Sequence, residues 1–155
     1  MNYWLMKSEP GACSIDSLKN DGETYWDGVR NFQARNFLRD QIKKGDLVLF
    51  YHSNAEPSGV AGIARVVREG YPDFTAWDKK DIHYDPKSAK DKPLWFMVDI
   101  EFVEKFPHFV ALEELKANPA LKGMMVIQRG SRLSVQPVEK KHFEMVYRMG
   151  RSHVD

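Results

Sequence analysis

Two apolar runs joined by a short turn constrain the fold of this chain more than any other feature of its sequence. Residues Leu47–Tyr51 are continuously apolar and rich in branched and aromatic side chains, which is typical of a buried strand. Pro57 and Gly59 mark a turn, and Val60–Val67 has the composition of a second strand. The pattern predicts a hairpin, with Gly62 at a bulge or at a close approach of another backbone.

Short strands and short helices are expected along the rest of the chain. Further strands are predicted at residues 3–6, 94–106 and 132–135, the last one ended by Pro137. Helices are predicted after Ser14 or Asp16, from Asn31 to Gln41 or Lys43 with a stop at Gly45, through residues 112–115 to 118–119, and over 139–149 with a stop at Gly150. Residues 124–127 fit either element, and residues 70–93 are predicted to be mostly loop.

The order of these elements decides the fold class. Strands and helices do not repeat as βαβ units, so we predict an α+β class, a mixed β-barrel or curved sheet with short helices packed around it. The 155 residues suit a single domain, which we place at residues 1–150, with a C-terminal tail at 151–155.

Charge and composition narrow the range of partners. The chain has 23 basic and 22 acidic residues, a net charge of +1, so it lacks the positive excess of proteins that hold nucleic acid mainly through phosphates. No apolar run reaches the roughly 18 residues of a membrane span, and the first residues do not resemble a secretory signal. The single Cys13 excludes an intramolecular disulfide. We expect a cytoplasmic location, or a nuclear one in a eukaryote, and no membrane contact.

The sequence lacks the motifs of common catalytic sites. The five histidines form no H-x-x-x-H or H-E-x-x-H pair, so no metal site is predicted. The glycines do not form a phosphate-binding loop, and no cofactor is expected. His52 and Ser53 are adjacent, but neighbours on a strand point to opposite faces, so they do not form a nucleophile–base pair. We therefore predict no catalytic residue.

Polar and aromatic residues gather where strands end or a helix begins. Three segments combine them, namely residues 7–10, 26–31 and 51–54. Aromatic walls with a few fixed donors and acceptors suit a flat heteroaromatic ligand such as a nucleobase, because stacking supplies roughly 1–3 kcal/mol per base and polar groups read its edge. Taken singly, these residues also fit plainer roles, with Trp26 in the core, Lys7 and Glu9 as a surface pair, and Asn31 as a helix cap.

Six blocks of sequence, in order along nearly the whole chain, resemble the EVE domain. The blocks are YWLMKSEP at 3–10, WDGVRNFQARN at 26–36, residues 45–54 from Gly45-Asp46 to Ser53-Asn54, GVAGIA at 59–64, YPDFTAWD at 71–78 and RGSRLSVQPV at 129–138.

This resemblance implies a fold and a function. EVE domains have a PUA-like fold, related to the PUA, YTH and ASCH domains, and much of the family is inferred to bind a modified base in DNA or RNA. It implies a non-catalytic nucleic-acid-binding module that takes a flipped base into an aromatic pocket. A separate protein partner would then act on the bound site, or binding would shield it.

On this interpretation, candidate binding residues fall into three groups. For stacking on the base, Trp26 is the first choice, and the further candidates are Trp4, Tyr51 and Trp77. For reading the base edge and a flanking phosphate, the candidates are Lys7, Ser8, Arg30, Asn31, His52 and Ser53. For the nucleic-acid backbone, the candidates are Arg35, Arg39, Lys43 and Lys44, which also fit an ordinary solvated helix face.

Two other functions stay open. ASCH-type relatives include small amidohydrolases that act on acylated cytidine, and Lys7 with Glu9 would be the proton-transferring pair of such an enzyme. Pro10 argues against this pair, because a strand that ends before Glu9 does not hold both side chains on one face. The third function is a protein-interaction module with an unused pocket.

Overall fold

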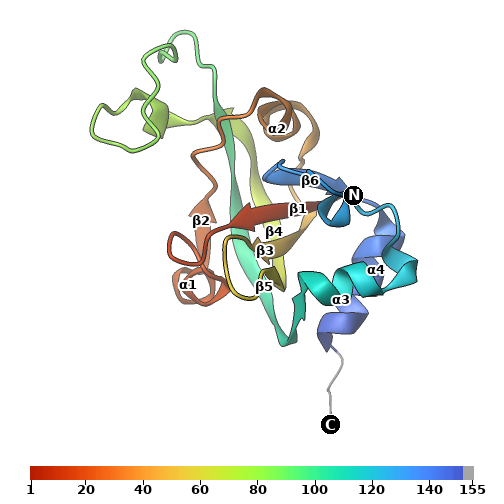
Figure 1. Ribbon diagram of the computed structural model, residues 1–155. Helices are drawn as coiled ribbons and strands as arrows, with labels where there is room; N and C mark the ends of the chain where they lie inside the picture. The colour runs from red at the N-terminus through yellow and green to blue at the C-terminus, as the bar shows by residue number, and fades with distance from the viewer. Residues whose placement is uncertain (152–155) are drawn as a thin grey trace.

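One curved, mixed sheet organises the molecule (Figure 1). The computed structural model describes residues 1–151, and within them the sheet has six strands in the order β2-β5-β4-β3-β1-β6. Strand β1 pairs in parallel with β3, and all other neighbouring strands are antiparallel. The strands are β1 (Tyr3–Ser8), β2 (Glu23–Tyr25), β3 (Leu47–His52), β4 (Gly59–Pro72), β5 (Phe96–Ala111) and β6 (Val135–Val138).

The central hairpin confirms the strongest prediction from the sequence. Strands β3 and β4 pair antiparallel across the turn that contains Pro57. The register of β4 against β5 shifts between Val60 and Gly62, which confirms the expected irregularity at this glycine. Both β4 and β5 run about five residues further than the pattern suggested, because they pair with each other along most of their length and bend together.

Short helices flank the sheet and begin at residues that the sequence predicts. Ser14 caps α1 through a capping box, and the side chain of Asn31 accepts a hydrogen bond from the backbone N–H of Ala34 at the start of α2. The predicted helix from Asn31 continues beyond α2 as one π-helical segment, Phe37–Gln41. The α-helices are α1 (Ile15–Asp21), α2 (Phe32–Asn36), α3 (Leu112–Ala117) and α4 (Lys140–Arg151), and the 3₁₀ segments are Phe74–Trp77, Pro119–Leu121 and Met125–Ile127.

The predicted ends of the last strand and of the last helix are both wrong. Pro137 does not break the last strand but lies inside β6, opposite Trp4. Because β6 is an edge strand of the sheet, a residue without an N–H is tolerated there. Gly150 does not stop α4, since the helix runs on to Arg151, and a Cβ at Gly150 would lie 2.3 Å from the ring of Phe106. Residues 152–155 of the predicted tail lie outside the described residues.

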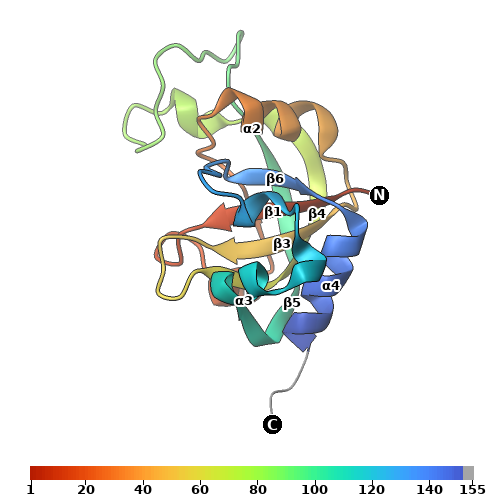
Figure 2. The ribbon, with the colours of Figure 1, turned by 45° about the vertical axis from the view of Figure 1, so that its right-hand side comes forward.

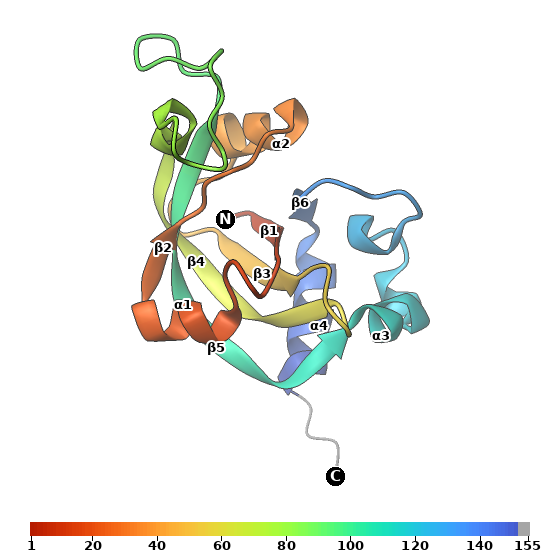
Figure 3. The same cartoon turned by 60° about the vertical axis from the view of Figure 1, so that its left-hand side comes forward.

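The sheet separates two hydrophobic clusters, one on each face. Along β1, Trp4 and Met6 belong to the cluster covered by α1 and α2, whereas Leu5 belongs to the cluster covered by α3 and α4. Figure 2 shows α3 beside α4, and Figure 3 shows these two helices away from α1. In the described part of the chain, no helix has the length and apolar character needed to cross a membrane. The α+β class is confirmed.

Candidate functional site

A pocket of about 750 Å³ opens beside the end of β1. Its walls come from segments far apart in the sequence, which the sheet and the long loop bring together. The end of β1 contributes Lys7, Ser8 and Glu9, and the chain from β2 to α2 contributes residues 24–30. The remaining walls are residues 12–13, Ser17, Asp21, Ser53, Ile82, His83, Arg132 and Ser134.

Trp26 lies between the hydrophobic core and this pocket. Its side chain is largely buried, and its ring packs edge-on against Phe50 with the centroids 5.6 Å apart. Its backbone N–H donates a hydrogen bond to the carbonyl of Val98 on β5, which fixes the segment that follows β2. Within residues 1–151, its indole N–H has no hydrogen-bond partner, and the residue lines the pocket. Trp26 therefore has both the core role and a surface that faces the cavity.

Arg30 forms the wall that connects the pocket to the long loop. Its guanidinium lies 2.9 Å from the carboxylate of the fully buried Asp73 and also donates hydrogen bonds to the carbonyl of His83. Burial by itself would raise the pKa of Asp73, but hydrogen bonds from Thr75, from the Gly28 N–H and from Arg30 lower it overall. This network anchors the loop against residues 28–30, so much of the donor capacity of Arg30 is already used.

Lys7 offers the pocket an amino group with few partners. Its Nζ lies 3.4 Å from the carbonyl of Ser131 and 5.9 Å from the centre of the Tyr51 ring. Partial burial lowers the pKa of Lys7. By contrast, the hydroxyl of Ser8 donates to the carbonyl of Cys13, and the carbonyl of Ser8 accepts from the N–H of Ser53. Lys7 is therefore better placed than Ser8 to donate a hydrogen bond to a ligand.

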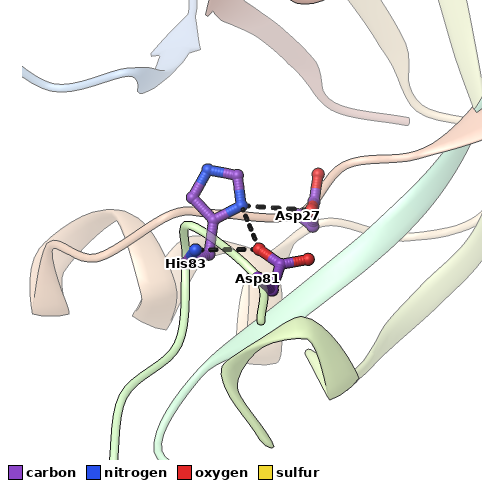
Figure 4. Close-up of side chains that lie close together, drawn as sticks. All are labelled: Asp27, Asp81 and His83. Carbon is purple, nitrogen blue, oxygen red and sulfur yellow. Dashed lines mark hydrogen bonds and ion pairs between the residues drawn. The ribbon is translucent and has the colours of Figure 1, made fainter. Parts of the chain in front are cut away.

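A histidine and two aspartates lie close together beside the pocket (Figure 4), and of these Asp27 and His83 line it. The Nδ1 atom of His83 lies 3.3 Å from Asp27 and 3.2 Å from Asp81. Gly28 has a φ of 79°, and a Cβ there would lie 2.5 Å from the His83 ring, so this glycine allows the ring to sit against the backbone. Burial raises the pKa of Asp27, and the nearby His83 opposes that shift. The three side chains are close enough to share a metal ion, and among the described residues the Nδ1 atom of His83 has these two carboxylate contacts but no hydrogen bond.

Three predicted stacking residues lie outside the pocket lining. Trp4 is buried, and its indole N–H donates to Asp46 at 2.9 Å, so the hydrophobic core and a buried acceptor fix its position. Tyr51 is buried in the cluster on the opposite face of the sheet, because side chains alternate along β3. Trp77 is half-buried in the 3₁₀ segment of the long loop and does not line the pocket.

Two predicted edge-reading residues have structural roles instead. The side chain of Asn31 caps α2, as the plainer interpretation held. His52 lies beneath α1, where its Nε2 accepts a hydrogen bond from the backbone N–H of Ile15 at 3.1 Å. Burial lowers the pKa of His52, which favours the neutral ring that this contact needs. Neither residue lines the pocket.

The predicted basic rim also lies outside the pocket lining. Arg35 donates to the carbonyl of Leu94, and Arg39 pairs with its neighbour Asp40. Lys43 lies 3.9 Å from Glu69, and the backbone of Lys44 donates to the same carboxylate. A role for these four residues in contacting a nucleic-acid backbone stays a prediction.

The structure adds residues that the sequence did not single out. Asp27, His83, Arg132 and Ser134 line the pocket together with Lys7, Ser8, Trp26, Arg30 and Ser53, the five candidates that the fold brings together. Asp27, Arg132 and Ser134 lie inside the blocks that carry the family resemblance, which was the available signal. His83 lies outside those blocks, and only the folding of the long loop brings it to the pocket.

Comparison with known proteins identifies related chains. The EVE domain profile matches residues 2–149. Thymocyte nuclear protein 1 of Homo sapiens is 43% identical over 164 aligned residues, which cover 94% of this chain and 72% of that protein. The crystal structure of human THYN1 in complex with 5-methylcytosine-containing DNA superposes with a TM-score of 0.91 at 42% identity, and covers 99% of this chain and 100% of that one.

A more distant comparison concerns the fold alone. A mutant form of the ASCH protein of Zymomonas mobilis matches with a TM-score of 0.55 at 8% identity, over 96% of this chain and 99% of that one. Together with the six-stranded mixed sheet and its short helices, these likenesses confirm the predicted PUA-like fold.

Proposed function

This chain belongs to the EVE domain family, and from that premise we propose that it is a non-catalytic module that binds a modified base of DNA or RNA in the pocket beside Trp26. The observation that carries the proposal is the composition of the pocket. The largely buried indole of Trp26, the amino group of Lys7 with its few partners and the carboxylate of Asp27 line a single cavity of about 750 Å³. An aromatic wall with a few polar groups is what a flat heterocycle requires.

The base must leave its stack to enter this cavity. Unstacking and unpairing cost a few kcal/mol, and contact with an aromatic wall returns roughly 1–3 kcal/mol. The polar groups must supply the remainder, and they must also distinguish one base from another. A single added methyl group contributes only about 0.8 kcal/mol when it is buried, so the modification is read by close fit rather than by hydrophobicity alone.

Charges near the pocket suit contact with a few phosphates. Lys7, Arg30 and Arg132 line the cavity, while the net charge of the whole chain is only +1. The same lining also carries Glu9, Asp21 and Asp27, so a bound nucleotide meets a few separate cations and no extended positive surface. This arrangement favours recognition of one site over general attraction to nucleic acid.

Oligonucleotides that differ at one base test the proposal. DNA with a single 5-methylcytosine is the natural first probe, since human THYN1 was crystallised with such DNA. We expect saturable binding, tighter than to the same oligonucleotide with cytosine, and without any change to the bound strand. RNA of matched sequence and a panel of other modified bases extend the test. Equal, weak binding to every oligonucleotide would contradict the proposal.

Hydrolysis of an acylated base is the second candidate function, and one observation favours it. The pKa of Lys7 is lowered by burial within the pocket, as a proton-transferring lysine requires. Glu9 fits less well, because β1 ends at Ser8 and the Glu9 carboxylate accepts a hydrogen bond from the Asn54 side chain at 2.7 Å. Release of acetate from N4-acetylcytidine by the protein, abolished in Lys7→Ala, would establish this activity in place of simple binding.

A further inference from the structure

The carboxylate of Asp27 stands in the pocket wall with most of its acceptor capacity unused. Its side chain is 27% exposed, and its contacts within the described residues are its own backbone N–H and the Nδ1 of His83 at 3.3 Å. The other carboxylates of the pocket lining differ from it. Glu9 is exposed and already accepts from Asn54, and Asp21 lies exposed at the end of α1. Asp27 is therefore the partly buried acceptor of this pocket.

The backbone on both sides of Asp27 is fixed. Before it, the N–H of Trp26 donates to β5. After it, the N–H of Gly28 donates to the buried Asp73 at 2.9 Å, and the His83 ring packs against the same glycine. A carboxylate on such a rigid segment can select a ligand, because it cannot move away from a group that does not match it.

An ionised carboxylate accepts hydrogen bonds and donates none. It therefore matches an exocyclic amino group, such as N4 of cytosine, and opposes a carbonyl oxygen at the same position, such as O4 of thymine. The amino group of Lys7 lines the same cavity and supplies a donor for a ring carbonyl. An acceptor and a donor together fit the amino and carbonyl groups of cytosine, whereas adenine offers no carbonyl.

We infer that Asp27 reads the exocyclic amino group of the extruded base, so that the pocket accepts bases of the cytosine type and rejects their keto counterparts. The inference rests on the proposed function and adds the class of base to it. Asp27 then determines specificity, while Trp26 supplies stacking that is similar for both classes of base.

The decisive pair of ligands is 5-methylcytosine and thymine, placed at one position of otherwise identical single-stranded oligonucleotides. Both carry the same methyl group and differ only in the amino or keto group and the adjacent ring nitrogen. Single strands avoid the cost of unpairing, which would differ between the two bases. We expect the protein without substitutions to bind the 5-methylcytosine oligonucleotide at least about tenfold more tightly than the thymine oligonucleotide.

Two substitutions assign the preference to Asp27. Asp27→Asn keeps the shape but presents both an acceptor and a donor, so the ratio of the two affinities should fall to about threefold or less, or reverse. Asp81→Asn is the matched control, because it changes the other carboxylate beside His83 but lies outside the pocket lining, and it should keep the preference. Asp27→Ala, which has no polar side chain, should also lose the preference. Thermal unfolding of each variant confirms that it is folded.

The outcomes separate the inference from the proposed function. Equal binding of both bases by the unmodified protein, or a preference that survives in Asp27→Asn and Asp27→Ala, would overturn the role of Asp27 and leave base binding standing. Absence of saturable binding to either oligonucleotide would overturn the proposed function, and the inference with it.

Discussion

Two places where a tryptophan lies near an aspartate differ in how completely the carboxylate is used. One pair is Trp4 with Asp46, where β1 begins. The other is Trp26 with Asp27, in the pocket wall. Both tryptophans are largely buried, and both belong to the same hydrophobic cluster. The burial of the two rings is similar, and the difference lies in the hydrogen bonds of the indole and of the carboxylate.

At the first pair both carboxylate oxygens accept hydrogen bonds. Asp46 is buried and accepts hydrogen bonds from the Trp4 indole, from the backbone N–H of Asn2 and from the backbone N–H of Lys43. These contacts join the start of β1 to the loop that precedes β3. At the second pair, the indole has no partner among the described residues, and Asp27 has only its own N–H and His83. The first pair is closed by hydrogen bonds within the fold, and we propose that the second is open to a ligand.

The largest expected effect comes from breaking the closed pair. Asp46→Ala removes three hydrogen bonds and leaves the buried indole N–H of Trp4 unsatisfied, which by itself costs about 1–3 kcal/mol. We expect the free energy of unfolding to fall by about 3 kcal/mol or more, measured by urea denaturation. Asp27→Ala is the comparison and should lower it by less than about 1 kcal/mol. A similar loss in both variants would contradict the distinction between the two pairs.

Substitution of the two rings should separate stability from binding. Trp4→Phe loses the hydrogen bond to Asp46 and part of a core side chain, so we expect a loss of about 2 kcal/mol in unfolding free energy and unchanged affinity for a 5-methylcytosine oligonucleotide. Trp26→Phe loses no hydrogen bond and reduces the stacking surface, so its affinity should fall about fivefold, or roughly 1 kcal/mol. Unchanged affinity in Trp26→Phe, measured by fluorescence or calorimetric titration, would remove this ring from the site.

The salt dependence of the affinity tests whether nucleic acid is bound mainly at the pocket beside Trp26 and Asp27 or along the basic rim that includes Arg39. An increase from 50 to 200 mM salt should weaken binding by about tenfold or less, because few phosphates are engaged. Arg39→Ala, which removes an arginine already paired with Asp40, should change the affinity less than twofold. A steep salt slope that Arg39→Ala reduces would show instead that the helix beyond Asn31 contacts the strand.

The smallest effect concerns pH. Burial raises the pKa of Asp27 in the folded protein above its unfolded value, so the folded state binds more protons between those two values and loses stability as pH rises through that range. Asp27→Asn removes this penalty. It should therefore be slightly more stable than the unmodified protein at pH 7, by less than about 1 kcal/mol, and the difference should vanish as pH falls below the pKa of the unfolded carboxyl. Thermal melts at several pH values measure the difference, and a gain that grows toward acid would contradict it.

Local pattern was enough to predict much of the fold. The hairpin of β3 and β4, the caps at Ser14 and Asn31, and the α+β class all follow from the spacing of apolar residues and from capping chemistry. The end of α4 could not be predicted in this way. Gly150 is helical because it packs against Phe106 in a distant strand, and nothing near it in the sequence indicates that contact.

The candidate site was predicted in part, for a related physical reason. Residues 51–54 place aromatic and polar side chains next to one another along the chain. Because side chains alternate along β3, Tyr51 lies in the hydrophobic cluster covered by α3 and α4, whereas His52 contacts the start of α1. Trp4 was misplaced because its partner Asp46 lies 42 residues away. His83 was missed because its position depends on the loop held by Arg30 and Asp73. Each error concerns a contact between segments that are remote in the chain.

The central position of β1 has a consequence for the order of assembly during synthesis. This strand is made first, yet its two neighbours are β3, which ends at His52, and β6, which ends at Val138. On the ribosome, residues 3–8 can pair along one edge early, but the other edge is covered only after residues 135–138 have been made. The cavity that begins at Lys7 is therefore completed only late in translation, when Arg132 and Ser134 have emerged.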